Sequence, residues 1–131
     1  MSDRIKFEQV SNWIHKSEDS LQAAEYLLRI GSAQGAINRM YYAAYHLISG
    51  LYAQDDITAK SHKGLKAKLG ELYIQNGKLE MRHATTLAKL FKMRLRADYS
   101  ADGYFTVEEA TEVLVPTKAM LKDLRALITI A

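Results

Sequence analysis

Apolar residues recur at helical spacing along nearly the whole chain. They return every three or four positions, which is typical of a helix with one buried face, and we find no convincing strand pattern. The pattern predicts five helices, at about residues 6–30, 33–53, 62–76 and 80–96, and from 107 onward. We therefore expect one all-α domain over residues 1–131, an antiparallel up-and-down bundle of four long helices and a shorter fifth.

Residues that start and stop helices separate these segments. Gly31 suits the end of the first helix, and Ser61 can cap the third. Thr106 begins a Thr-x-x-Glu capping box that opens the last helix. Pro116 lies inside that helix and is expected to kink it or break it briefly. The stretch "ADYSADGY", residues 97–104, is expected to be a loop.

The second predicted helix carries chemistry on the side opposite its core stripe. On a helical wheel the core stripe covers an arc of about 140°. It contains Ile37, Met40, Tyr41, Ala44, Leu47, Ile48, Leu51 and Tyr52. Arg39 and His46 lie on the other side, about 20° apart, with Tyr42 beside them. Arginine can clamp a phosphate and histidine can move protons near neutral pH, so the pair suits metal-independent RNA cleavage. The alternative is that both residues only form hydrogen bonds across an interface.

A ribbon of small residues also runs along this helix. It consists of Ser32, Ala36, Ala43 and Gly50. A mid-helix glycine costs about 1 kcal/mol relative to alanine, which indicates that another helix comes close. We expect the ribbon to face away from the protomer's own core and to contact a second subunit in a two-fold dimer. The dimer would let Arg39 and His46, separated by roughly 10.5 Å of helical rise, share one cleft.

The charge is unevenly distributed. Residues 60–96 contain ten basic and two acidic residues, whereas the rest of the chain has a net charge of −5. This basic segment predicts either an electrostatic footprint for phosphate or a solvated lysine-rich face. The chain has no cysteine, no signal peptide and no apolar run of the roughly 18 residues that span a bilayer, so a cytoplasmic location is expected. His15 and His83 are expected at the surface, and neither a metal site nor a cofactor is expected.

Three motifs, taken together and in order, resemble the HEPN domain family. They are "AINRMYYAAYH" (36–46), "SHKGL" (61–65) and "RLRADY" (94–99), and "TVEEATEVL" resembles the opening of the family's last helix. The resemblance is to small stand-alone prokaryotic HEPN proteins and covers almost the whole chain. It implies a helical bundle that commonly dimerises and an Arg-x6-His site for metal-independent ribonuclease activity. Arg39 would then clamp the scissile phosphate, His46 would transfer the proton, and Asn38 and Tyr42 would orient them.

The resemblance also implies partners. RNA or a nucleotide would be contacted by His62, Lys63, Arg94, Asp98 and Tyr99. The structural alternative is that His62 sits at a helix start and that an Arg94–Asp98 ion pair is capped by Tyr99. In the family a frequent partner is a minimal nucleotidyltransferase that acts as antitoxin, so we expect a homodimeric toxin of a toxin–antitoxin pair. The alternative is a non-catalytic HEPN module that binds a nucleotide or a nucleotidyltransferase partner.

Overall fold

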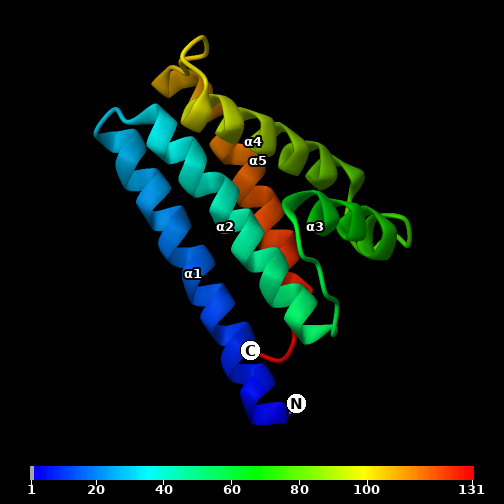
Figure 1. The fold of residues 1–131 in the computed structure, drawn as a ribbon. Coiled ribbons are helices and arrows are strands. Elements are labelled where there is room, and N and C mark those ends of the chain that lie inside the picture. The colour runs from blue at the N-terminus through cyan, green and yellow to red at the C-terminus, as the bar shows by residue number, and fades with distance from the viewer. Residues whose placement is uncertain (1) are drawn as a thin grey trace.

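The computed structural model describes residues 2–131, which form an all-helical bundle (Figure 1). Its elements are α1 (Asp3–Arg29), α2 (Ala33–Gln54), α3 (His62–Leu69) with a π-helical turn η1 (Gly70–Ile74), α4 (Met81–Tyr99) and α5 (Val107–Ala126). Four helices are long, the fifth is short, and no strand occurs in the described residues, so the predicted fold class is confirmed. Within residues 2–131 no helix is both long enough and apolar enough to cross a membrane.

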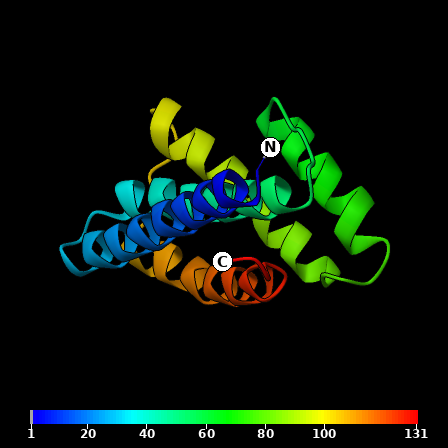
Figure 2. The same ribbon diagram turned by 90° about the horizontal axis from the view of Figure 1, so that it is seen from below.

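Helix α2 lies at the centre of the bundle. It packs against α1, α4 and α5, and every residue of its predicted core stripe is buried. Figure 1 shows α1 and α2 side by side, with both chain ends at the same end of the bundle. Helix α3 lies on the far side of α2 from α1 (Figure 2). The central helix therefore presents residues to neighbours from three other parts of the chain.

The predicted helix ends are largely found. Gly31 has a φ of +82°, and its N–H donates to the carbonyl of Leu28, which closes α1. The Ser61 hydroxyl accepts the Gly64 N–H at 2.9 Å and caps α3. Thr106 opens α5 with both hydrogen bonds of a capping box. These local devices fix where each helix starts and how tightly the turns between them close.

Two expectations about helix boundaries are wrong. Helix α4 continues through Tyr99, so the loop expected at 97–104 begins only at Ser100. Helix α5 runs through Pro116 without a break, so of the two effects expected of this proline the brief break does not occur. Proline removes one backbone hydrogen bond, but Val113 and Met120 are buried on either side and hold both halves of the helix against the core.

The ribbon of small residues packs against α1 of the same chain, so the expectation that it faces a second subunit is wrong. Ala43 is fully buried, and its carbonyl accepts a hydrogen bond from the Ser17 hydroxyl at 2.7 Å. A Cβ atom added at Gly50 would lie 3.1 Å from the Cβ of Trp13. A helical wheel identifies a ribbon that permits close approach, but it does not say which helix approaches. We call this contact between α1 and α2 the α1–α2 seam.

Candidate active site

Arg39, Tyr42 and His46 lie on one half-buried face of α2, as the helical wheel predicts. The Arg39 guanidinium carbon is 5.2 Å from the centre of the Tyr42 ring, within range of a cation–π contact. The Tyr42 ring centre is in turn 5.9 Å from that of His46. One protomer therefore links the arginine to the histidine through the tyrosine between them, without a second subunit.

Asn38 holds the Arg39 side chain. Its Oδ1 atom accepts hydrogen bonds from Nε and Nη2 of Arg39, at 3.0 and 2.8 Å. Its Nδ2 atom donates to Asp98 on α4 at 2.9 Å. Because the acceptor facing Arg39 is a neutral amide and not a carboxylate, the guanidinium is oriented but its positive charge is not neutralised. The charge remains free to attract a phosphate.

His46 packs between two aromatic rings. Its ring centre lies 5.6 Å from that of Trp13 on α1 and 5.9 Å from that of Tyr42. Burial lowers the pKa of His46 below its ordinary value; the Lys16 backbone partly opposes the shift, and the charges of Lys16 and Arg39 add to it. The Nδ1 atom is buried and makes no hydrogen bond with the described residues. The lowered pKa favours the neutral form of His46, which is the form that can accept a proton.

The ring of His62, at the start of α3, contacts two tyrosines of α2. Its Nδ1 atom lies 2.6 Å from the Tyr41 hydroxyl, and its ring centre lies 4.7 Å from that of Tyr45. Burial raises the pKa of Tyr41 far above its usual value, whereas burial and the Arg94 charge lower the pKa of His62. Tyr41 is buried and its hydroxyl has no other acceptor among the described residues, so it donates to Nδ1. His62 then carries its proton on Nε2. Ser61 performs the capping of α3.

Arg94 is buried and lies against the rings of Tyr41 and Tyr42. Its guanidinium carbon is 5.0 Å from the Tyr41 ring centre and 5.6 Å from that of Tyr42. Its Nη1 atom donates to the Tyr42 hydroxyl at 3.4 Å and lies 3.7 Å from Asp98. The Arg94–Asp98 ion pair expected under the structural alternative is therefore present. Tyr99 does not cap it, because that residue is 77% exposed. Arg94 joins the α4 motif to the α2 motif.

Nine residues were predicted from the sequence to be catalytic or to bind RNA or a nucleotide. All but two of them, Lys63 and Tyr99, contact one another or the aromatic rings around them. Lys63 is exposed and lies beside His62, and Tyr99 points away from this group into solvent. Sequence reasoning missed Tyr45, the Tyr41 hydroxyl and Trp13. No sequence signal reveals these three contacts, because each depends on which helix packs beside α2.

A second polar cluster joins α4 to α5. His83 is fully buried, so the expectation that it lies at the surface is wrong, and its Nε2 atom lies 2.7 Å from Asp123. Glu80 is close enough to complete a possible three-residue metal site. However, Arg82 lies 3.2 Å from Glu80 and 3.6 Å from Asp123, and the hydrogen bond from His83 lowers the pKa of Asp123. We interpret this cluster as an ion-pair network that fixes the start of α4 on α5.

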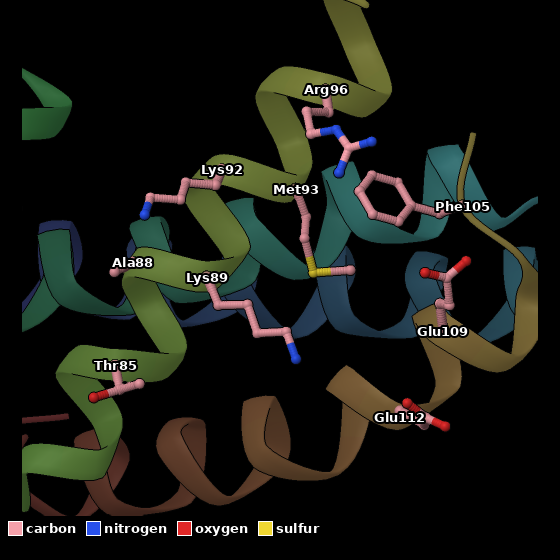
Figure 3. Close-up of a pocket in the computed structure, with 9 residues that line it drawn as sticks. All are labelled: Thr85, Ala88, Lys89, Lys92, Met93, Arg96, Phe105, Glu109 and Glu112. Atoms are coloured by element: carbon pink, nitrogen blue, oxygen red, sulfur yellow. The ribbon is translucent and has the colours of Figure 1, made fainter. Parts of the chain in front are cut away.

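A surface hollow with a volume of about 550 Å³ lies between α4 and α5 (Figure 3). Lys89 and Arg96 line it from α4, and Glu109 and Glu112 line it from α5. Phe105 lies beneath the Arg96 guanidinium, 5.2 Å from ring centre to carbon. With Lys92 included, three basic residues of α4 face two acidic residues of α5, so most of the positive charge in this hollow is compensated.

Comparison with known proteins identifies the family. The model of the HEPN domain matches residues 10–127. The chain belongs to the HEPN family. It is 28% identical over 116 residues to a protein of Methanocaldococcus jannaschii named "Putative toxin MJ0605", covering 88% of this chain and 85% of that protein. It is 26% identical to a second protein of that organism, "Putative toxin MJ0142", over 81% of this chain and 72% of the other. A "UPF0332 protein" of Thermotoga maritima is 23% identical, over 91% and 90% of the two chains.

Proposed function

We propose that this HEPN protein is a toxin that cleaves RNA without a metal ion, with Arg39 and His46 as its catalytic residues. The observation that carries the proposal is the placement of an oriented, uncompensated guanidinium and a neutral imidazole on one half-buried face. Two relatives that are named as toxins support the toxin role. The cytoplasm, where RNA is available, is the expected location.

The reaction begins with the 2′-hydroxyl of the RNA. His46 accepts its proton while the 2′-oxygen attacks the adjacent phosphorus, and Arg39 stabilises the negative charge that builds on the phosphate oxygens. The bond from phosphorus to the 5′-oxygen breaks. This leaves a 2′,3′-cyclic phosphate and a 5′-hydroxyl, whose oxygen takes a proton from water or from the His46 of a second copy. Asn38 and Tyr42 keep Arg39 in position throughout.

Two further parts of the proposal concern partners. The face that carries Arg39, Tyr42, Tyr45 and His46 is half-buried and rich in aromatic rings, which suits it to pair with the same face of a second copy. A minimal nucleotidyltransferase is the antitoxin that the family resemblance implies. Mass measurement of the purified protein tests the first part, and relief of toxicity by co-expression of the neighbouring nucleotidyltransferase gene tests the second.

Cleavage of a structured RNA in EDTA tests the catalytic proposal. Purified wild type, Arg39→Ala and His46→Ala are compared, with the oligomeric mass of each determined. Arg29→Ala and His15→Ala are matched controls, because both remove the same residue types from exposed positions on α1. We expect cleavage by the wild type and both controls only. Equal cleavage by all five proteins, or none by the wild type, refutes the proposal.

A non-catalytic HEPN module is the second candidate. It is favoured by the engagement of Arg39, because two of its nitrogens already donate to Asn38 and its guanidinium lies over the Tyr42 ring. In that case the same face binds a nucleotide or a nucleotidyltransferase partner without cleaving RNA. Binding of RNA with unchanged RNA length in the assay above would select this candidate.

A further inference from the structure

A second cleft opens between α3 and α4, on the flank of α4 next to the hollow in Figure 3, and the two depressions share Ala88 and Lys92. Its volume is about 310 Å³, at the lower end of the range for small-molecule sites. Its apolar wall includes Tyr41, Leu87 and Phe91, and its rim carries Lys63, Lys66 and Lys92. We call it the α3–α4 cleft. We propose that it binds one nucleotide of single-stranded RNA, with the base against the aromatic wall and a phosphate at the lysines.

Three aromatic rings line the cleft, those of Phe91, His62 and the buried Tyr41. The Phe91 ring centre lies 5.7 Å from that of Tyr41 and 5.9 Å from that of His62. Phe91 and His62 are half-buried, so their rings keep surface that a ligand can reach. Nucleobases bind proteins by stacking on such rings, and every base offers the flat face that this requires. His62 adds a hydrogen-bond donor, because its Nε2 atom carries the proton.

The charge of the cleft distinguishes it from the hollow in Figure 3. None of the described residues that line it is acidic, and three are lysines. Lys92 lines both depressions, and in Figure 3 its side chain extends away from Phe105. An apolar wall with an uncompensated cationic rim fits a ligand that has a flat apolar part and an anionic part. A nucleotide has both.

The buried Arg94 side chain connects the wall of the cleft to the candidate active site. The Arg94 guanidinium carbon lies 5.0 Å from the Tyr41 ring centre, 5.4 Å from that of Phe91 and 5.6 Å from that of Tyr42. Tyr41 and Phe91 belong to the cleft, whereas Tyr42 belongs to the face with Arg39 and His46. An RNA strand at that face can therefore place a neighbouring nucleotide in the cleft. This role in substrate binding rests on the proposed function.

Binding of an uncleavable RNA tests the proposal. The probe is a mixed-sequence RNA hexamer in which every 2′-oxygen is methylated, so the nucleophile is blocked. Phe91→Leu removes the stacking ring but keeps an apolar side chain, and Lys66→Glu reverses one rim charge. We expect Phe91→Leu to weaken binding about tenfold or more, as loss of a stacked base does, and Lys66→Glu to weaken it because a rim charge that attracts phosphate is reversed. Lys68→Glu is the matched control, since it lies on the same helix but does not line the cleft, and it should change binding much less.

Competition with small ligands separates a nucleotide site from a plain anion site. Adenosine and uridine 5′-monophosphates should displace the hexamer at concentrations at which inorganic phosphate does not. The inference is overturned if phosphate competes equally well, if Phe91→Leu binds as the wild type does, or if Lys66→Glu and Lys68→Glu weaken binding equally. Circular dichroism establishes that each variant is folded, and Lys66→Glu tests the site even if Phe91→Leu is unstable, because Lys66 is exposed.

The cleavage assay distinguishes this inference from the proposed function. A wild-type protein that binds the hexamer through the cleft but does not cleave ordinary RNA refutes the nuclease and leaves the nucleotide site intact. A protein that cleaves RNA, and whose Phe91→Leu and Lys66→Glu variants bind and cleave normally, refutes the nucleotide site alone.

Discussion

Replacement of Gly50 by alanine tests the α1–α2 seam directly. Gly50 is buried, and the new Cβ atom would lie 3.1 Å from the Cβ of Trp13 and 3.7 Å from the carbonyl oxygen of Val10. Carbon atoms prefer separations of about 3.5–4.0 Å. The Trp13 and Val10 atoms belong to or adjoin the α1 backbone, so they cannot rotate away, whereas the third neighbour, Ile128 Cδ1 at 3.7 Å, is the end of a flexible side chain. The two helices must move apart by a few tenths of an ångström.

Two opposing effects set the expected magnitude. Alanine is favoured over glycine inside a helix by about 0.8–1.0 kcal/mol. Overpacking of a tight core costs about 1–3 kcal/mol. We therefore expect Gly50→Ala to lower the free energy of unfolding by about 1 kcal/mol. Gly70→Ala is the matched control, because Gly70 also has helical backbone angles, φ −61° and ψ −50°, but an added Cβ there meets nothing within 4 Å. That change should raise the free energy of unfolding by up to about 1 kcal/mol.

Urea unfolding followed by circular dichroism measures both variants against the wild type. The reasoning predicts shifts of opposite sign. If Gly50→Ala stabilises the protein as much as Gly70→Ala does, α1 does not approach α2 as closely as the structure has it. Sizing of the two variants adds a second criterion. If the wild type is a dimer and Gly50→Ala, but not Gly70→Ala, yields a folded monomer, the ribbon of small residues contacts a second subunit. That result would contradict the packing of the ribbon against α1 of the same chain.

Three further predictions concern the side chains of Asn38, of Tyr52, and of His46 with His62. Asn38→Ala should lower RNA cleavage by about tenfold to a hundredfold through loss of Arg39 orientation, whereas Asn12→Ala on α1 should not; equal rates would exclude an orienting role for Asn38. Tyr52→Phe should cost about 1–3 kcal/mol in urea unfolding, because the Leu65 carbonyl loses a buried 2.6 Å hydrogen bond, and exposed Tyr26→Phe should be neutral. The pKa values of His46 and His62 are lowered on folding, so as pH falls below about 6.5 the unfolded chain binds protons first and stability declines. In urea melts from pH 8 to 5, a double His46→Gln, His62→Gln variant should lose less stability than the wild type, and an equal loss would contradict this cause.

The sequence predicted what depends on a single helix. The wheel of α2 places Tyr41 in the core and Tyr42 beside Arg39 and His46, and the structure has both there. The start of α5 was predicted from two residues, Thr106 and its capping-box partner Glu109, and the structure has both of their hydrogen bonds. Such signals are local because they rest on residues three to seven positions apart, which any helix brings together.

Contacts between helices were predicted less well, for a physical reason. Asn38 and Asp98 are sixty residues apart, and only the packing of α4 on α2 brings them to 2.9 Å. His83 was misplaced because its burial depends on α5, from which Asp123 reaches it. The small-residue ribbon was seen, but its partner helix was not. Periodicity gives the direction in which a side chain points along its own helix and contains no information on what lies opposite.

The α1–α2 seam has a consequence for the order in which the molecule is made. The two helices are consecutive in the chain, joined by the tight turn at Gly31, and they share the most extensive contact in the fold. Local contacts of this kind form early, because closing a short loop costs little chain entropy. During synthesis the hairpin of α1 and α2 can thus bring Trp13 against His46 before α3 and α4 exist. We expect a nascent chain to hold half of its candidate site from that stage, and to complete it only when Arg94 and Asp98 have been translated.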